Sequence, residues 1–121
     1  MEHLESIELK TFVPAKDFEL SKRFYKDLGF SMNFDDGNLA YFCHNDCSFL
    51  LQNYYVKEYA DNFMMHLLVK NTDAWWEHIK STGVIEKYNI RAESPEVKSW
   101  KMKDFTLVDP AGVLWRFGEN I

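Results

Sequence analysis

The chain repeats one order of predicted elements, and this repeat restricts the fold more than any other feature. A predicted strand at Ile7–Val13 precedes a predicted helix at Asp17–Leu28, and a predicted strand at Phe63–Val69 precedes a predicted helix at Asp73–Thr82. A glycine follows each helix, and the two aspartates lie 56 residues apart. Such a repeat is typical of two copies of one supersecondary unit, so we expect each half to bury its sheet against the other.

Short strands and turns fill the remainder of each half. In the first half we predict strands at Ser31–Phe34, Leu39–Cys43 and Ser48–Asn53; in the second, a weak strand near Tyr88–Arg91 and a hairpin of Phe105–Val108 with Val113–Phe117. Asp109-Pro110-Ala111-Gly112 supplies the residues that a tight turn prefers. The predicted class is therefore α+β, with two βαβββ units, residues 5–53 and 63–119, in one domain spanning 1–121.

Two segments fit this pattern less well. Residues 54–62 are predicted to connect the units, with a short helix as one option, and Glu86–Ser99 is the least regular stretch and is predicted to form a mobile flap.

Composition narrows the classes of function. A net charge of −5 argues against a nucleic-acid partner, and no apolar run approaches the length of a membrane span. Cys43 and Cys47 are too few for a disulfide scaffold, so we read them as reduced thiols. The start of the chain carries no signal-peptide pattern, and we expect a cytoplasmic protein. Aromatic residues make up 17% of the chain, enough to line a groove as well as a core.

Three pieces of sequence resemble the vicinal-oxygen-chelate superfamily, which contains glyoxalases, extradiol dioxygenases and bleomycin resistance proteins. They are Phe24-Tyr25 followed by Leu28-Gly29-Phe30, the stretch Met65–Val69 followed by Asp73, and the closing run from Trp100 through Asp109-Pro110-x-Gly112 to Gly118. The last piece is most similar to the bleomycin resistance branch.

The resemblance implies a curved mixed sheet with helices outside and a cup-like cleft. In the bleomycin resistance branch it also implies a homodimer, often with exchanged strands, that binds the antibiotic without transforming it. Enzymes of the superfamily instead hold one divalent metal with His, Gln or Glu side chains from four strands.

On this chain, the superfamily's metal positions fall on Lys10, Gln52, His66 and Arg116 when the offset of 56 is applied. A guanidinium has no lone pair to offer, and lysine is protonated near neutral pH. Glu8 and Lys10 share one face of the first predicted strand, so a register shift of two residues would put Glu8 in place of Lys10. Arg116 would still repel a metal cation. We therefore predict no metal, no cofactor and no catalytic residue. We interpret His66 as a polar strand residue that faces the cleft.

The predicted function is metal-independent binding of an aromatic or cationic small molecule, possibly a bleomycin-type antibiotic, in a dimeric cleft, with a role in antibiotic resistance. The predicted ligand-binding residues are Lys10, Phe12, Gln52, His66, Trp100, Asp104 and Arg116. Lys10 and Arg116 are expected either to pair with Glu8 and Asp104 or to bind an anionic ligand group, and Trp100 either stacks on a flat ligand or packs in a dimer seam.

Two alternatives stay open. One is a metal-dependent enzyme of the glyoxalase or dioxygenase type, and the other is a subunit whose cleft binds a protein. Trp115 alternates with Arg116 and is predicted to point into the helix-packed core rather than into the cleft.

Overall fold

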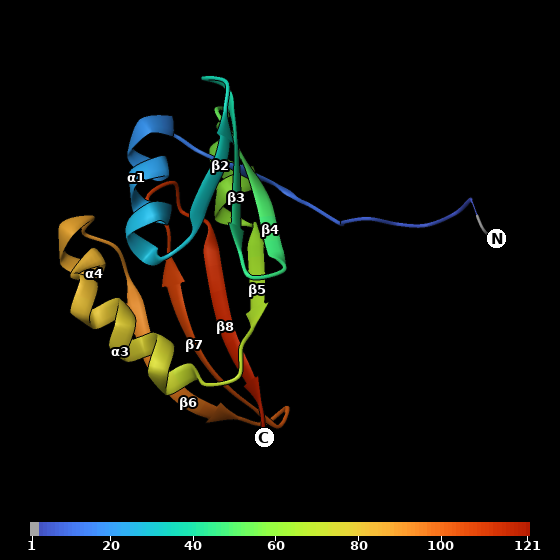
Figure 1. Ribbon diagram of the computed structural model, residues 1–121. Helices are drawn as coiled ribbons and strands as arrows, with labels where there is room; N and C mark the ends of the chain where they lie inside the picture. The colour runs from blue at the N-terminus through green and yellow to red at the C-terminus, as the bar shows by residue number, and fades with distance from the viewer. Residues whose placement is uncertain (1–2) are drawn as a thin grey trace.

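The computed structural model describes residues 3–121 as two four-stranded mixed sheets with helices packed against one face (Figure 1). The first sheet has the order β1 (Phe12–Pro14), β4 (Cys47–Gln52), β3 (Leu39–His44) and β2 (Ser31–Asp35), and the second has the order β5 (Met64–Leu68), β8 (Leu114–Asn120), β7 (Met102–Val108) and β6 (Ala92–Lys98). Among residues 3–121, only the pairs β1–β4 and β5–β8 are parallel. The helices are α1 (Phe18–Leu28), α2 (Lys57–Asp61), α3 (Thr72–Thr82) and α4 (Val84–Lys87).

The repeat is visible in the two long helices, but its offset differs from the prediction. Both α1 and α3 have 11 residues, and each begins at a side chain that accepts a backbone N–H bond, from Leu20 to Asp17 and from Ala74 to Asn71. The helices end at Gly29 and Gly83, so the offset is 54 residues. Overlaying Asp17 on Asp73 was therefore wrong by two positions, because Asn71 is the residue that caps the second helix.

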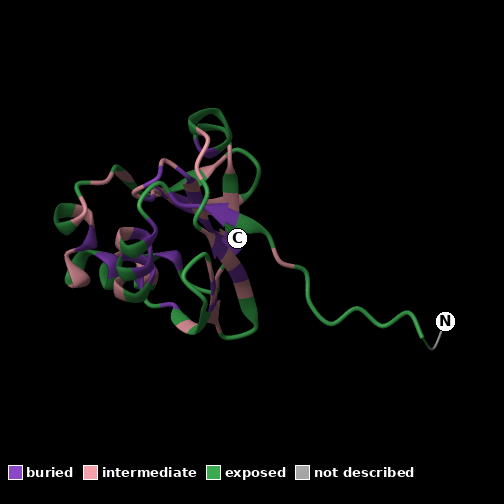
Figure 2. Cartoon of the chain, turned by 90° about the horizontal axis from the view of Figure 1, so that it is seen from above, coloured by how far each residue is buried: buried purple, intermediate pink, exposed green. Residues whose placement is uncertain are grey.

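Aromatic rings fill the space between the helices and both sheets, which is the buried region in Figure 2. Phe42 and Phe49 stack across β3 and β4 at 5.5 Å and 10°, and Phe105 and Phe117 stack across β7 and β8 at 4.7 Å and 9°. Trp115 is buried among them on the helix side, as alternation along the strand predicts. The two sheets thus use equivalent cross-strand pairs in one core.

A buried polar network joins the first helix to the closing hairpin. The Tyr25 hydroxyl donates to Asp109 Oδ2 and accepts from Trp115 Nε1 at 2.9 Å, while the N–H groups of Ala111 and Val113 each donate to Asp109 Oδ1 at 2.9 Å. Burial raises the pKa of Asp109 to about 6 even though these hydrogen bonds favour its ionised form. The turn that was recognised as a local signal is therefore held by a tertiary contact from α1.

The prediction of a strand at Ile7–Val13 is wrong for its N-terminal part. Pairing with β4 begins only at Phe12, and the preceding residues extend away from the body of the molecule (Figure 1). Ile7 and Leu9 are 98% and 94% exposed there. We call residues 3–11 the N-terminal arm.

The flap prediction and the weak strand at Tyr88–Arg91 are also wrong. The chain leaves α4 at Tyr88, and the polar stretch that follows forms β6 along the edge of the second sheet. The pairing of β6 with β7 shifts between Glu93 and Glu96, around Pro95, and an edge strand tolerates such a break. The short helix offered for the connector is α2. None of the helices within residues 3–121 combines the length and the hydropathy needed to cross a bilayer.

Candidate functional site

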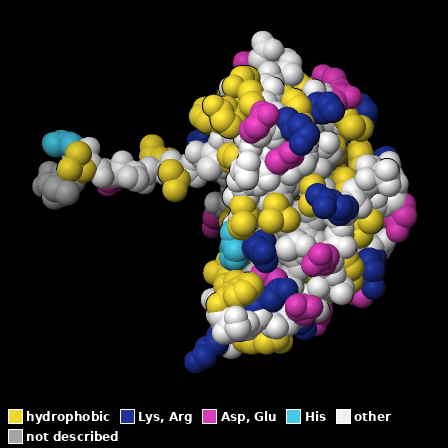
Figure 3. All heavy atoms as spheres, turned by 180° about the vertical axis from the view of Figure 1, so that it is seen from behind, with side chains coloured by type: hydrophobic (Ala, Val, Ile, Leu, Met, Phe, Trp, Pro, Cys, Tyr) yellow, Lys and Arg dark blue, Asp and Glu magenta, His cyan; other side chains and the backbone are white. Residues whose placement is uncertain are grey.

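Both sheets leave large apolar side chains uncovered on the face turned away from α1, α3 and α4, which we call the open face. Phe12, Phe34, Met64 and Leu68 are 52% to 56% exposed there, and Trp100, in the turn before β7, is 57% exposed. Figure 3 shows hydrophobic side chains on the flank from which the N-terminal arm extends, with basic and acidic side chains next to them. Exposed apolar area of this kind marks a binding surface or an interface.

A charged cluster lies on the part of the open face that β6, β7 and β8 form; we call Lys98, Trp100, Asp104 and Arg116 the Arg116 cluster. Arg116 Nη1 donates to Asp104 Oδ2 at 3.1 Å, and the guanidinium lies 6.0 Å from the centre of the Trp100 ring. Lys98 Nζ is 2.8 Å from Glu96 and 4.0 Å from Asp104 Oδ1. The ion pair with Asp104, one of the two roles expected for Arg116, thus forms, and it occupies one of the five N–H donors of the guanidinium.

Asp104 is the anchor of this cluster. Its side chain is 1% exposed, and its Oδ1 atom has no hydrogen-bond partner within residues 3–121. A buried carboxylate is retained only where a cation compensates it, so Asp104 holds Arg116 in place beside Trp100.

His66 lies next to this cluster through strand pairing. It is the register partner of Arg116 in the parallel pair β5–β8 and is exposed on the open face. Gly118 makes room for its ring, since a Cβ atom at that position would lie 2.8 Å from His66 Nε2.

Two other predicted residues lie in a separate cavity of about 620 Å³, which we call the connector cavity. Its lining combines the ends of β1 and β4 with the connector: Phe12, Pro14, Gln52, Tyr54, Glu58, Tyr59, Asn62 and Phe63. Four aromatic rings and one carboxylate therefore surround the space, and within residues 3–121 Glu58 takes part in none of the ion pairs. The sequence analysis did not predict the connector residues of this cavity. Three tyrosines within the short polar segment 54–62 could have indicated them.

Lys10 belongs to neither group. Its ammonium lies 2.7 Å from Glu8 and 5.4 Å from the centre of the Tyr41 ring, and the Tyr41 hydroxyl donates to Glu8 Oε2 at 2.8 Å. The hydrogen bond between Lys10 and Glu8 lowers the pKa of Glu8 and raises the pKa of Lys10. Lys10 therefore stands apart, because it lies on the arm. Phe12 and Gln52 lie in the first sheet, whereas His66, Trp100, Asp104 and Arg116 lie with the second, so the seven predicted residues fall into separate groups.

The donor set does not suit a divalent metal. With the offset of 54, the residue equivalent to His66 is Phe12, and the strand partners of these two residues are Arg116 and Leu50. Only His66 among the four offers a lone pair to a cation. Within residues 3–121 there is also no cluster of three or more His, Cys, Asp and Glu side chains that could hold one.

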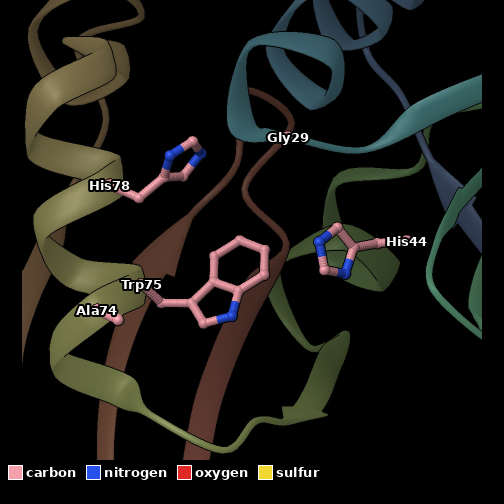
Figure 4. A pocket seen from close by; sticks show the side chains of 5 residues that line it. All are labelled: Gly29, His44, Ala74, Trp75 and His78. Carbon is pink, nitrogen blue, oxygen red and sulfur yellow. The ribbon is translucent and has the colours of Figure 1, made fainter.

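A smaller cavity of about 290 Å³ lies on the other side of the molecule, where α1 and β3 meet α3 (Figure 4). The imidazole of His44 and that of His78 flank the Trp75 indole, at 5.0 Å and 5.8 Å between ring centres. His78 Nε2 lies 3.0 Å from the carbonyl oxygen of Leu28 and donates to it, so this histidine joins α3 to the end of α1. These rings serve the contact between the two halves and lie apart from the predicted site residues. Cys43 and Cys47 are both free thiols.

Comparison with known proteins gives consistent matches over nearly the whole chain. A family model described as the Glyoxalase/Bleomycin resistance protein/Dioxygenase superfamily matches residues 3–117. A bleomycin resistance protein of Klebsiella pneumoniae is 27% identical over 114 residues, which cover 89% of this chain and 88% of that protein.

Solved structures agree with this match. A bleomycin-binding protein complexed with bleomycin aligns with a TM-score of 0.82 and 25% identity, over 96% of this chain and all of that one (100%). A bleomycin resistance determinant encoded on the transposon Tn5 aligns with a TM-score of 0.79 and 25% identity, over 94% and 98% of the two chains. A lactoylglutathione lyase from Agrobacterium tumefaciens shares the fold at 18% identity, with a TM-score of 0.69 over 96% and 95% of the chains.

Proposed function

Because this chain belongs to the Glyoxalase/Bleomycin resistance protein/Dioxygenase superfamily, we propose that it sequesters a bleomycin-type small molecule in a cleft between two copies, without a metal and without transforming it. The observation that supports the proposal is that the open face carries two separate groups of ligand-binding character, the connector cavity and the Arg116 cluster, which we interpret as half-sites. The solved relative with a TM-score of 0.82 is a bleomycin-binding protein complexed with bleomycin. A cytoplasmic location stays a prediction.

The connector cavity is suited to a cationic ligand with apolar or aromatic parts. Aromatic faces attract a cation within about 6 Å of the ring centre, and the attraction strengthens when water is displaced. Glu58 adds a negative charge that forms no ion pair within residues 3–121. A volume of about 620 Å³ lies within the range of small-molecule sites.

The Arg116 cluster supplies a different kind of contact. Trp100 is 57% exposed and offers a flat surface on which a planar ligand group can stack. Arg116, held by Asp104, has N–H donors left for a carbonyl or other acceptor on the ligand. The two half-sites therefore recognise different parts of one elongated molecule.

A second copy of the chain is the partner that fits the open face. Twofold symmetry would place the connector cavity of each copy opposite the Arg116 cluster of the other, which doubles the site and covers the exposed apolar residues. The N-terminal arm would extend the contact, because Ile7 and Leu9 are almost fully exposed and would bury apolar surface against the second copy. Exchange of the arms between copies is part of this proposal.

Titration with bleomycin tests the proposal, with tryptophan fluorescence and calorimetry as readouts and sedimentation equilibrium for the dimer. We expect saturable binding with one site per chain, which is two sites per dimer. The variants Trp100→Ala and Glu58→Gln are each expected to weaken binding by about tenfold, which corresponds to about 1.4 kcal/mol. The variant Glu86→Gln makes the same charge change on α4, away from the open face, and serves as the control.

Two results would count against the proposal. Absence of any response at tens of micromolar bleomycin would remove the support for binding of this class. Stoichiometric zinc, nickel or manganese after dialysis, lost in the variant His66→Ala, would instead favour the metal-dependent enzyme.

A further inference from the structure

A third cavity, of about 320 Å³, lies where the two halves of the chain meet at the closing turn, and we call it the seam cavity. The first half contributes Lys16, which precedes α1, Leu20 from the first turn of α1, and Tyr55 of the connector. The second half contributes Tyr88 to Arg91 and the segment from Val108 to Gly112. The seam cavity shares no lining residue with the connector cavity, although Tyr54 and Tyr55 are neighbours in the chain.

Two basic side chains line the seam cavity without a carboxylate partner among residues 3–121. Within these residues, eight of the 14 Lys and Arg side chains form ion pairs. Lys16 and Arg91 are not among the eight, and both are exposed. Lys16 Nζ instead lies 5.6 Å from the centre of the Tyr55 ring, inside the range of a cation–π contact.

The carboxylates near the cavity already form hydrogen bonds or ion pairs within the chain. Asp109, which lines it, is 2% exposed, and its oxygens accept from Tyr25 and from backbone N–H groups of its own turn. Asp17 accepts from the N–H of Leu20 at 3.1 Å, and Asp61, next to Gly112, pairs with Lys57 at 2.6 Å.

Asp27 lies beyond the Tyr88 wall of the cavity. It accepts from the Tyr88 hydroxyl at 2.6 Å and pairs with Lys87 at 2.8 Å. The accessible charge in the seam cavity is therefore positive, although the chain as a whole carries −5.

We propose that the seam cavity binds a small anion that carries a carboxylate or a phosphate group. Arg91 can form two parallel hydrogen bonds to either group, and Lys16, from the other half of the chain, adds a mobile point charge. The volume is at the small end of the range for ligand sites, about 300–1,000 Å³, which favours a compact anion. Such a ligand would contact both halves of the chain, so its binding would stabilise the folded protein.

The experiment is a titration of the full chain with inorganic phosphate and, separately, with benzoate, at constant ionic strength set by sodium chloride. Melting temperature and the amide chemical shifts of Tyr55, Asn89 and Arg91 are the readouts. We expect a saturable response at millimolar concentrations for at least one of the two anions. The stronger anion identifies whether phosphate or carboxylate is the preferred group.

The double variant Lys16→Gln with Arg91→Gln is expected to weaken the response at least tenfold. The double variant Arg23→Gln with Lys26→Gln is the matched control, because it also removes one arginine and one lysine, both exposed and outside the ion pairs, from the same protein. The control should titrate like the unaltered chain. The proposal is overturned if neither anion acts beyond chloride, or if both double variants lose the response equally, since that would reflect net charge alone.

Discussion

Removal of one buried hydroxyl, in the variant Tyr25→Phe, should destabilise the fold by about 2–4 kcal/mol at pH 7.5. The hydroxyl satisfies two buried groups at once: it donates to Asp109 Oδ2 and accepts from Trp115 Nε1 at 2.9 Å. A buried donor left without a partner costs about 1–3 kcal/mol, and a hydrogen bond to a charged group contributes about 1.5–3 kcal/mol. Burial raises the pKa of Tyr25 itself, so the phenol stays protonated and remains the donor.

The loss should depend on pH, and its sign follows from Asp109. Burial raises the pKa of this carboxyl from 3.8 to about 6 in the folded protein. Because the folded pKa lies above the unfolded one, the contribution of Asp109 to stability is fully present below pH 4 and is lost as the pH rises through 6, in total about 3 kcal/mol. The Tyr25 hydrogen bond lowers this pKa and so reduces the loss. The variant should therefore be destabilised more at pH 7.5 than at pH 4.5.

Urea unfolding at the two pH values measures both effects, and comparing the variant with the unaltered chain cancels the titration of other groups. The variant Tyr88→Phe is the control: it removes a hydroxyl that donates to Asp27 at 2.6 Å, but Asp27 keeps its pair with Lys87. The control should cost about 1 kcal/mol or less. A difference below about 0.5 kcal/mol for Tyr25→Phe, or the same difference at both pH values, would refute the reasoning about this network.

Three further predictions concern the repeat, the cleft and the arm. The variant Asn71→Ala should lower the free energy of unfolding in urea by about 1 kcal/mol because it removes the cap of α3. The variant Asp73→Ala should change it by less than half as much. If Asp73→Ala cost more, Asp73 would be the cap and the repeat offset would be 56. The variant Gly118→Ala should lower the melting temperature and weaken bleomycin binding, because its Cβ atom would lie 2.7 Å from Met102 Sδ and 2.8 Å from His66 Nε2; unchanged binding in calorimetry would contradict a role for this part of the open face. Deletion of residues 1–11 should shift the sedimentation equilibrium toward monomer, and a dimer of unchanged affinity would show that the arm is not part of the interface.

The family and the α+β architecture, both predicted from the sequence, are confirmed. Both depend on local signals: helix-capping side chains, glycines after the helices, and a turn whose proline and glycine set the backbone. The buried position of Trp115 was also predicted, because alternation along a strand assigns faces once the strand is recognised.

The sequence by itself thus determined the repeated βαβββ order, the turn and the family of this protein, and it identified Arg116 and Asp104 as an ion pair or a ligand contact. Only the tertiary structure decided which residues share a site. It placed Lys10 on the arm, made Phe12 the equivalent of His66, and brought the connector into the cavity that holds Phe12 and Gln52. Strand register and the packing of a connector depend on contacts between residues far apart in the chain, and a shift of two positions in a helix cap moves every inferred equivalence.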